Sequence, residues 1–251
     1  MFFSHLMNIR RTDLVLEIGP GSLPHWRADV LADKFDSNDV TPGGNFGGEK
    51  LRTDGKPFFK LINNRLPFKE NAFDYVICSH VLEHVPAEEI PILLEEIFRV
   101  APKAYIEFPA PLYDVVHSFE AHINFLDIDG DTIYCLPKTK ASCINKTFTD
   151  FTMHLRTDQR YHAARGQEHL FAVGREFCRG QYVFDLVDDE ESFFRIVKQK
   201  TYYCHKAALP WRAMNWLRGK ISTSLGRRLD QKRLDAIVTE GTAPVSLSEI
   251  Q

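Results

Sequence analysis

Short apolar runs bounded by turn residues dominate the chain from Leu14 to Pro109. Runs of about four to eight apolar residues between turns are typical of buried strands. The segments between them leave room for helices, and this alternation predicts an α/β fold with a mostly parallel sheet covered on both faces. The predicted strands are Leu14–Ile18, Asp29–Lys34, Pro57–Ile62, Asp74–Ser79 and Lys103–Pro109.

The clearest helix signal spans Pro86–Val100. This segment opens with a proline, carries acidic residues early and then repeats apolar residues at helical spacing, all of which are typical of a helix and its N-terminus. A loop is predicted at 43–48, where four of six residues are glycine.

The pattern becomes irregular between residues 110 and 165, which are rich in histidine, aspartate and aromatic residues. We interpret this segment as an insertion that builds a substrate pocket. Two apolar runs follow, His169–Gly174 and Gln181–Val187. Their six-residue separation predicts an antiparallel pair.

The C-terminal part differs in charge from the rest of the chain. Residues 205–233 hold eight Lys or Arg and one acid, Asp230, a net charge of +7 that leaves −10 for the remainder. Leucine or isoleucine recurs every four residues, as on one side of a helix, at Leu217, Ile221, Leu225 and Leu229. We therefore divide the chain into a domain at 1–204 and a basic amphipathic helical tail at 205–251.

Composition narrows the class of protein. The chain has 251 residues, 44% of them hydrophobic, enough for one large core, and its formal net charge of −3 gives no basic field for nucleic acid. No apolar run approaches the roughly 20 residues of a membrane helix, and the N-terminal charges follow the apolar stretch, the reverse of a secretory signal. We expect a soluble, cytoplasmic protein.

The five cysteines are scattered and never form C-x-x-C. Neither disulfides nor a cysteine zinc site is expected.

A glycine turn follows the first predicted strand, in the string E-I-G-P-G at Glu17–Gly21. Glycine lets the backbone turn sharply and lets a ligand approach it closely. The third glycine of a dinucleotide-binding fingerprint would fall at Pro24, so the usual binding site for a pyrophosphate is incomplete. Asp33 ends the second predicted strand, where an acid can bind both hydroxyls of a ribose.

These features belong to an ordered series of motifs. The string L-P-F at Leu66–Phe68 precedes F-D-Y-V-I-C-S-H-V-L-E-H-V, then E-I-F-R-V and a strand ending Y-I-E-F-P. Together with the glycine turn and Asp33, the series resembles the class I S-adenosylmethionine-dependent methyltransferases over roughly Leu14–Pro111. The resemblance implies a Rossmann-like, seven-stranded, mostly parallel sheet with an antiparallel last strand.

The resemblance also implies roles for particular residues. The loop under the methionine part of S-adenosyl-L-methionine would hold Glu17, Gly19, Pro20 and Gly21. Asp33 would bind the ribose, Asn63 the adenine amine, and Ser79 and His80 would lie beside the methyl group. The sequence departs from the family at Leu23, where a third glycine is usual, and Asn63 lies one place off the common spacing to L-P-F.

The string S-H-V-L-E-H-V contains H-x-x-E-H, the signature of an inverted zinc peptidase. In a helix, His80 and His84 would share one face. Pro86 follows at once and disfavours helix in the residue before it, so both histidines fit in at most one short turn. We therefore expect no metal here, and structural roles for Glu83 and His84. The zinc peptidase remains a less favoured alternative.

The favoured function is methylation of a hydroxyl on a small molecule or glycan, which needs a base. Histidine suits this role because its pKa lies near neutral pH. Four residues cluster after the last predicted strand of the series, namely Glu107, His117, Glu120 and His122. His122 is the first candidate and His80 the second. The alternative is a non-catalytic cofactor-binding or scaffold protein. The basic tail at 205–233 suggests either peripheral membrane contact or a helix docked on the sheet or on a second subunit, and the docked helix is the favoured interpretation.

Overall fold

The computed structural model describes residues 6–22, 24–34, 51–117, 120–141, 172–198 and 229–245. The side chains of Leu112, Val116, His117 and Lys198 are not described. Several expectations fall outside these ranges: the glycine-rich loop at 43–48, the departure at Leu23, and the basic segment up to residue 228.

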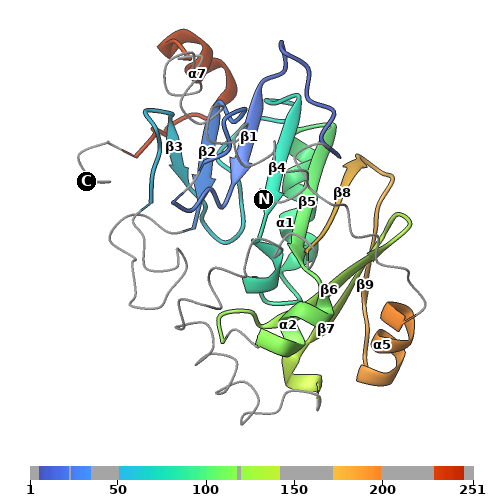
Figure 1. Cartoon of the computed structure of the whole chain (residues 1–251). Helices are drawn as coiled ribbons and strands as arrows, with labels where there is room; N and C mark the ends of the chain where they lie inside the picture. Colours follow the sequence, from blue (N-terminus) through green and yellow to red (C-terminus); the bar gives the residue numbers. More distant parts are fainter. Residues whose placement is uncertain are drawn as a thin grey trace, which may run out of the picture.

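The main sheet contains every strand predicted between Leu14 and Pro109. In the described part of the chain it has six strands, ordered β3-β2-β1-β4-β5-β8 (Figure 1). All neighbours are parallel except β5 and β8. The strands are β1 (Val15–Ile18), β2 (Val30–Asp33), β3 (Phe58–Lys60), β4 (Tyr75–Ser79), β5 (Lys103–Pro109) and β8 (Ala172–Cys178).

This topology confirms the Rossmann-like α/β prediction with an antiparallel last strand, although six strands are described where seven were expected. The order of the strands reverses between β1 and β4, because the chain passes from β1 outward to β3 and then returns. Ligands of open α/β sheets bind beyond the carboxyl ends of the strands at such a switch point.

The string H-x-x-E-H spans the end of β4 and a short 3-10 turn, η2 (Leu82–His84). Helix α1 (Ile90–Val100) begins only after Pro86 and three further residues. The structure thus confirms that no continuous helix carries both histidines. The predicted helix is also confirmed, but it starts four residues later than expected.

In the second half of the chain the predicted strand pairing was wrong, and part of the segment with an irregular sequence pattern has regular structure. Residues 110–141 are regular: α2 (Pro111–His117), β6 (Asn124–Asp129) and β7 (Thr132–Pro137) are followed by the turn η3 (Lys138–Lys140). Strand β9 (Val183–Leu186), which precedes α5 (Glu190–Lys198), pairs with β7 and not with β8. β6, β7 and β9 form a separate sheet.

Buried polar residues explain why β6 was missed. Asn124 and Asp127 lie within the strand and are buried, so its apolar run is broken although five of its six residues are enclosed. β8 was mispaired because its partner, β5, is distant in the sequence, with β6 and β7 between them. A rule that pairs strands adjacent in the sequence cannot predict a pairing between strands this far apart.

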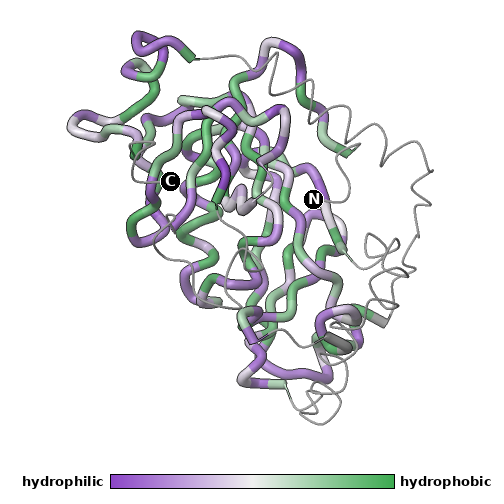
Figure 2. The backbone as a smooth tube through the Cα atoms, turned by 60° about the vertical axis from the view of Figure 1, so that its left-hand side comes forward, coloured by the Kyte–Doolittle hydropathy of each residue, from purple (hydrophilic) through white to green (hydrophobic). Residues whose placement is uncertain are grey.

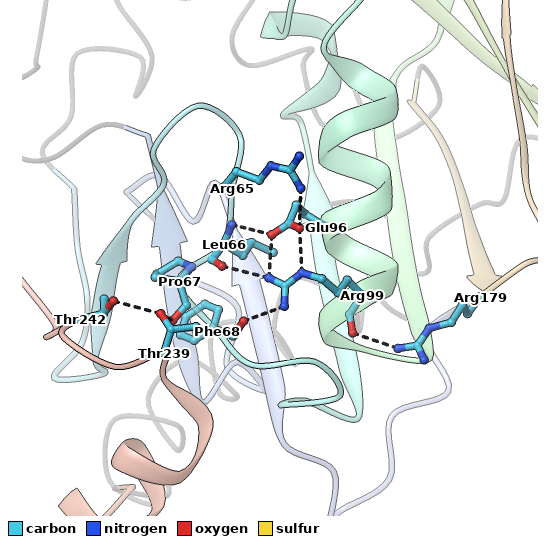
Figure 3. Close-up of polar contacts among 9 residues, drawn as sticks. All are labelled: Arg65, Leu66, Pro67, Phe68, Glu96, Arg99, Arg179, Thr239 and Thr242. Atoms are coloured by element: carbon cyan, nitrogen blue, oxygen red, sulfur yellow. Dashed lines mark hydrogen bonds and ion pairs between the residues drawn. The ribbon is translucent and has the colours of Figure 1, made fainter.

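A charged network fastens α1 to the L-P-F segment (Figure 3). The Glu96 carboxylate accepts hydrogen bonds from the Leu66 backbone N–H at 3.0 Å and from the Arg99 side chain at 2.7 Å. Arg99 in turn donates to the carbonyls of Leu66 and Phe68. Burial opposes ionisation of Glu96, but the bonds from Arg99 and Leu66 outweigh it and lower its pKa to about 2.

The C-terminal described segment packs onto the main sheet. Helix α7 (Gln231–Ile237) is capped by Asp230, whose side chain accepts from the Arg233 N–H. Leu234, Ile237 and Val238 are buried in the main core. Val238 also forms a β-bridge with Phe68, so part of the predicted tail belongs to the core of the fold.

Figure 2 shows hydrophobic stretches in green and hydrophilic ones in purple, alternating along the tube. The core residues with the largest enclosed side chains include Tyr75, Tyr105, Phe59 and Phe68. Within the described ranges, no helix has the length and apolar character that crossing a bilayer requires.

Candidate functional site

A pocket opens where the sequence predicted a ligand, at the carboxyl ends of the parallel strands. Its cavity volume is about 60 Å³, so it is a narrow cleft at the switch point of the sheet, where ligands of open α/β folds bind. Its walls come from the segments that follow β1, β2, β3 and β4 and from α1. The lining residues are Ile18, Gly19, Gly21, Asp33, Lys34, Leu61, Asn64, His80, Val81, His84, Val85 and Leu93.

The floor of this pocket is the turn after β1. Gly19 and Gly21 both have positive φ, at 68° and 57°, which favours glycine. A Cβ on Gly19 would collide with the side chain of Val81. The glycine therefore lets the turns after β1 and β4 approach each other closely.

Two acids lie near this turn, and the structure separates their roles. Asp33 is buried at the end of β2 and lines the pocket. Glu17 does not line it; its carboxylate accepts a 2.7 Å hydrogen bond from the His25 backbone N–H and so holds the loop beyond the glycines. Burial raises the pKa of Glu17 to about 7, against the lowering effects of His25 and Lys56.

The other residues implied by the resemblance lie around the pocket without lining it. Pro20 is buried beneath the glycine turn. Asn63 is exposed, and its neighbour Asn64 takes the place along the pocket wall. The Ser79 hydroxyl donates to Glu107 at 2.7 Å.

His80 follows β4 directly and has left-handed backbone, with φ at 58°. Left-handed backbone at a residue other than glycine costs about 1–3 kcal/mol of stability and often marks a functional site. Its Nδ1 lies 3.2 Å from Glu83 Oε1 and its Nε2 lies 3.4 Å from Glu107 Oε1. Burial opposes protonation, yet Glu107 and Glu83 raise the pKa of His80 to about 9. The ring is therefore an imidazolium at neutral pH.

Glu107 is enclosed among donors at the end of β5. Ser79 and Tyr105 donate to its two oxygens, each at 2.7 Å. Burial opposes its ionisation, but His80 and the Tyr105 hydroxyl hold its pKa well below the ordinary range of a glutamate. Glu107 thus provides a fixed negative charge beneath His80.

The structure brings His122 to the turn η2, next to His84. The two rings meet edge to face, with centroids 4.8 Å apart and an interplanar angle of 80°. His84 Nδ1 lies 2.7 Å from the Ala121 carbonyl, and His122 Nδ1 lies 2.9 Å from Asp114 Oδ1. Burial lowers the pKa of His84 although Glu83 raises it.

Hydrogen bonds between backbone segments hold this arrangement in place. The Ile123 N–H donates to the Glu83 carbonyl at 2.8 Å. The buried Asn124 amide donates to the Val85 carbonyl at 2.6 Å. The start of β6 is therefore attached to the turn that lines the pocket.

Sequence reasoning named His80, Glu83, His84 and His122 but did not join them. The motif H-x-x-E-H holds only the first three of these residues, whereas His122 comes from the loop before β6. One sequence signal points to His122. It lies in the segment that follows β5, and ligands of open α/β sheets bind beyond the carboxyl ends of such strands.

Comparison with known proteins agrees with the motif series. Residues 50–108 match a family model described as a methyltransferase domain. This match confirms the resemblance over the segment that carries L-P-F, S-H-V-L-E-H-V and Y-I-E-F. A search of the curated proteins found no match.

Solved structures align with the chain only distantly. One from Methanosarcina mazei, described as S-adenosylmethionine-dependent methyltransferases, is 18% identical over 48% of this chain and 68% of that chain, with a TM-score of 0.32. The PH0226 protein of Pyrococcus horikoshii OT3 is 17% identical, covering 59% and 74%, also with a TM-score of 0.32. Similarity at this level transfers no detail of the site.

Proposed function

We propose that this chain, which carries a methyltransferase domain of the class I S-adenosylmethionine-dependent type, transfers a methyl group to a hydroxyl of a small molecule or glycan. The proposal depends chiefly on one observation. The glycine turn after β1 and the buried carboxylate of Asp33 after β2 face one pocket at the switch point of the sheet.

The residues present fit S-adenosyl-L-methionine. Gly19 and Gly21 line the pocket without side chains that would keep a ligand away from the backbone, and Asp33 supplies a carboxylate at the place where a ribose diol would lie. Bound there, the cofactor supplies a methyl group already activated by a positive sulfonium. Asp33, Gly19 and Gly21 then hold and orient it, and the apolar wall of Leu61, Val81 and Val85 excludes water.

Orientation accounts for much of such a reaction. Holding an acceptor in line with the methyl group can supply on the order of 7–11 kcal/mol of the barrier reduction. Proton removal would fall to a histidine. His80 is poorly suited because its two carboxylate partners keep it protonated. His122 is better suited, since its Nδ1 donates to Asp114 and Nε2 is then the ring nitrogen that can accept a proton.

Calorimetric titration with S-adenosylhomocysteine tests the proposal. The wild-type protein should bind it, and Asp33→Ala should weaken binding about 10- to 100-fold, because hydrogen bonds to a charged group contribute about 1.5–3 kcal/mol. Asp131→Ala is the matched control; this exposed aspartate pairs with Arg175 and should leave the affinity unchanged.

Two results would contradict the proposal: no binding by folded wild-type protein, or equal binding by wild type and Asp33→Ala. Cofactor binding without methyl transfer to any acceptor in a cell extract would instead favour the scaffold alternative.

We further propose a cytoplasmic enzyme without a nucleic-acid partner, whose basic segment at 205–233 contacts anionic membranes. Eight Lys and Arg residues and the tryptophans Trp211 and Trp216 support this membrane contact. Co-sedimentation with vesicles of phosphatidylserine and phosphatidylcholine tests it, with Arg227 and Arg228 changed to Glu as the comparison. Equal sedimentation of both proteins would refute it.

A further inference from the structure

Glu83, His84 and His122 each present one potential ligand atom to a common point beside the cofactor pocket. These atoms all lie within 4.8 Å of one another. Two residues come from the turn after β4, and the third comes from the loop before β6. The set joins two imidazoles and one carboxylate, the donor types that bind divalent transition metals.

Both histidines use Nδ1 for a hydrogen bond, which leaves Nε2 to bind a metal. A carbonyl oxygen can only accept, so His84 Nδ1 must donate to Ala121. Nε2 of the neutral ring then carries the lone pair. His122 Nδ1 is oriented in the same way by Asp114, which Lys138 also holds at 3.1 Å. Metal-binding histidines commonly use the second ring nitrogen to donate to a carbonyl or carboxylate.

The carboxylate of Glu83 gives independent support. The residue is 1% exposed, and His80 holds its Oε1. Its Oε2 is buried and has no hydrogen-bond partner among the described residues. A buried, unsatisfied carboxylate oxygen is costly and calls for an explanation such as an ion.

From this geometry we infer that Glu83, His84 and His122 form a binding site for a divalent transition metal, with zinc as the first candidate. His80 is a positioning residue that holds Glu83. Ligand atoms about 2.0–2.2 Å from zinc lie about 3.4 Å apart in a tetrahedral site. The widest pair, now within 4.8 Å, therefore has to close by about 1.4 Å at most.

The position of the site gives it a role that rests on the proposed function. His84 belongs both to this cluster and to the wall of the cofactor pocket. Three protein ligands leave a fourth position open, as in catalytic metal sites. An acceptor hydroxyl at that position would be polarised and would lose its proton more easily. His122 would then act as a ligand and not as the base.

The assisted step balances as follows. A bond forms between the acceptor oxygen and the methyl carbon. The bond between that carbon and the donor sulfur breaks, and its electron pair stays on sulfur, which becomes neutral. The hydroxyl proton leaves to solvent. No oxidant or reductant takes part.

Titration with Co²⁺ alone tests the site, because its visible absorption reports nitrogen and oxygen ligands. The full-length protein, freed of metal by chelator, should bind one equivalent. Glu83→Gln and His84→Gln should abolish this stoichiometric binding, and Asp114→Asn should weaken it about 10- to 100-fold through the orientation of His122. Zn²⁺ should displace the Co²⁺ signal.

Two controls separate the site from general effects. Glu120→Gln removes an exposed acid two residues from His122, and His25→Gln removes a histidine outside the cluster; both should bind Co²⁺ as wild type does. Circular dichroism checks that each variant is folded. Glu83→Gln preserves the volume of a buried side chain, which favours folding.

Binding of S-adenosylhomocysteine is measured on the same metal-free protein. If it binds while Co²⁺ does not, or while Co²⁺ binding ignores Glu83→Gln and His84→Gln, the metal site is refuted and the proposed function stands. If Co²⁺ binds as expected and S-adenosylhomocysteine does not, the proposed function fails and the metal site stands.

Discussion

At the scale of single residues, left-handed backbone recurs around the pocket. Gly19, Gly21 and His80 all have positive φ, and all three line the pocket. For the glycines this conformation is inexpensive, but His80 needs its two carboxylate partners to hold it there. The same partners make its ring a cation.

Gly19→Ala should abolish measurable binding of S-adenosylhomocysteine. The added Cβ meets the Val81 side chain in addition to the penalty for positive φ, and together these should cost about 2–4 kcal/mol of unfolding free energy. Gly130→Ala is the control, since its φ is 55° but a Cβ there meets nothing within 4 Å. Calorimetric titration and urea unfolding measure both quantities. Equal loss of stability in the two variants would contradict the steric explanation.

Several site residues could be predicted from the sequence because a motif places each of them locally. Gly19, Gly21 and Asp33 follow predicted strands and line the pocket as expected. The approach of His122 to His84 could not be predicted in this way. It depends on the hydrogen bonds that join the start of β6 to η2 and its flanking residue Val85, which are distant in the sequence.

At the scale of elements, α1 is secured by charge as well as by its apolar face. Glu96 accepts from Leu66, Arg65 and Arg99 at once. The L-P-F segment that these bonds hold runs beside the pocket-lining Asn64. The L-P-F motif is thus a docking point for the helix.

Replacement of Glu96 by Gln should make stability less dependent on pH in acid. The folded-state pKa of Glu96 is lowered from 4.5 to about 2, so its stabilising effect is present above pH 4.5 and is lost as the pH falls toward 2. At pH 6 the unfolding free energy of the wild type should exceed that of the variant by about 1–3 kcal/mol. This difference should decrease as the pH falls from 4.5 toward 2.

Urea unfolding at several pH values measures this difference. Glu95→Gln is the control, because Glu95 is an exposed neighbour on the same helix and should not change the pH dependence. A gap between wild type and Glu96→Gln that stays constant from pH 6 to pH 2.5 would disprove the linkage.

The strands of the main sheet between Leu14 and Pro109 were predicted, whereas β6 and β7 of the second sheet were not. β1, β4 and β5 lie close to their expected bounds because both faces of a central parallel strand are buried. β6 contains Asn124 and Asp127, whose burial is compensated by hydrogen bonds that only the folded structure shows. Pattern alone could not reveal them.

At the scale of the whole molecule, residues near the C-terminus complete a core formed mainly by the first half of the chain. Leu234 is 5% exposed and packs in the same cluster as Phe68 and Phe73. The Val245 N–H donates to the Phe58 carbonyl at 2.8 Å. The described part of the basic tail therefore packs on the main body, in keeping with the interpretation of a docked helix.

Leu234→Ala should therefore destabilise the protein by about 2–4 kcal/mol, as large-to-small changes in a core do. Lys232→Ala on the exposed side of α7 should change stability by less than about 0.5 kcal/mol. Urea unfolding monitored by tryptophan fluorescence compares the two. Similar, small effects from both substitutions would show that α7 contributes little to the core.

The pairing of β5 with β8 also has a consequence for the protein during its synthesis. Lys103 lies opposite Cys178 and Pro109 opposite Ala172, so the whole segment that holds α2, β6 and β7 must leave the ribosome before the open edge of β5 is covered. Until then β5 presents unpaired N–H and C=O groups, a template for pairing with another chain. Closure of such a long loop is slow, and we expect the nascent chain to need protection by chaperones in that interval.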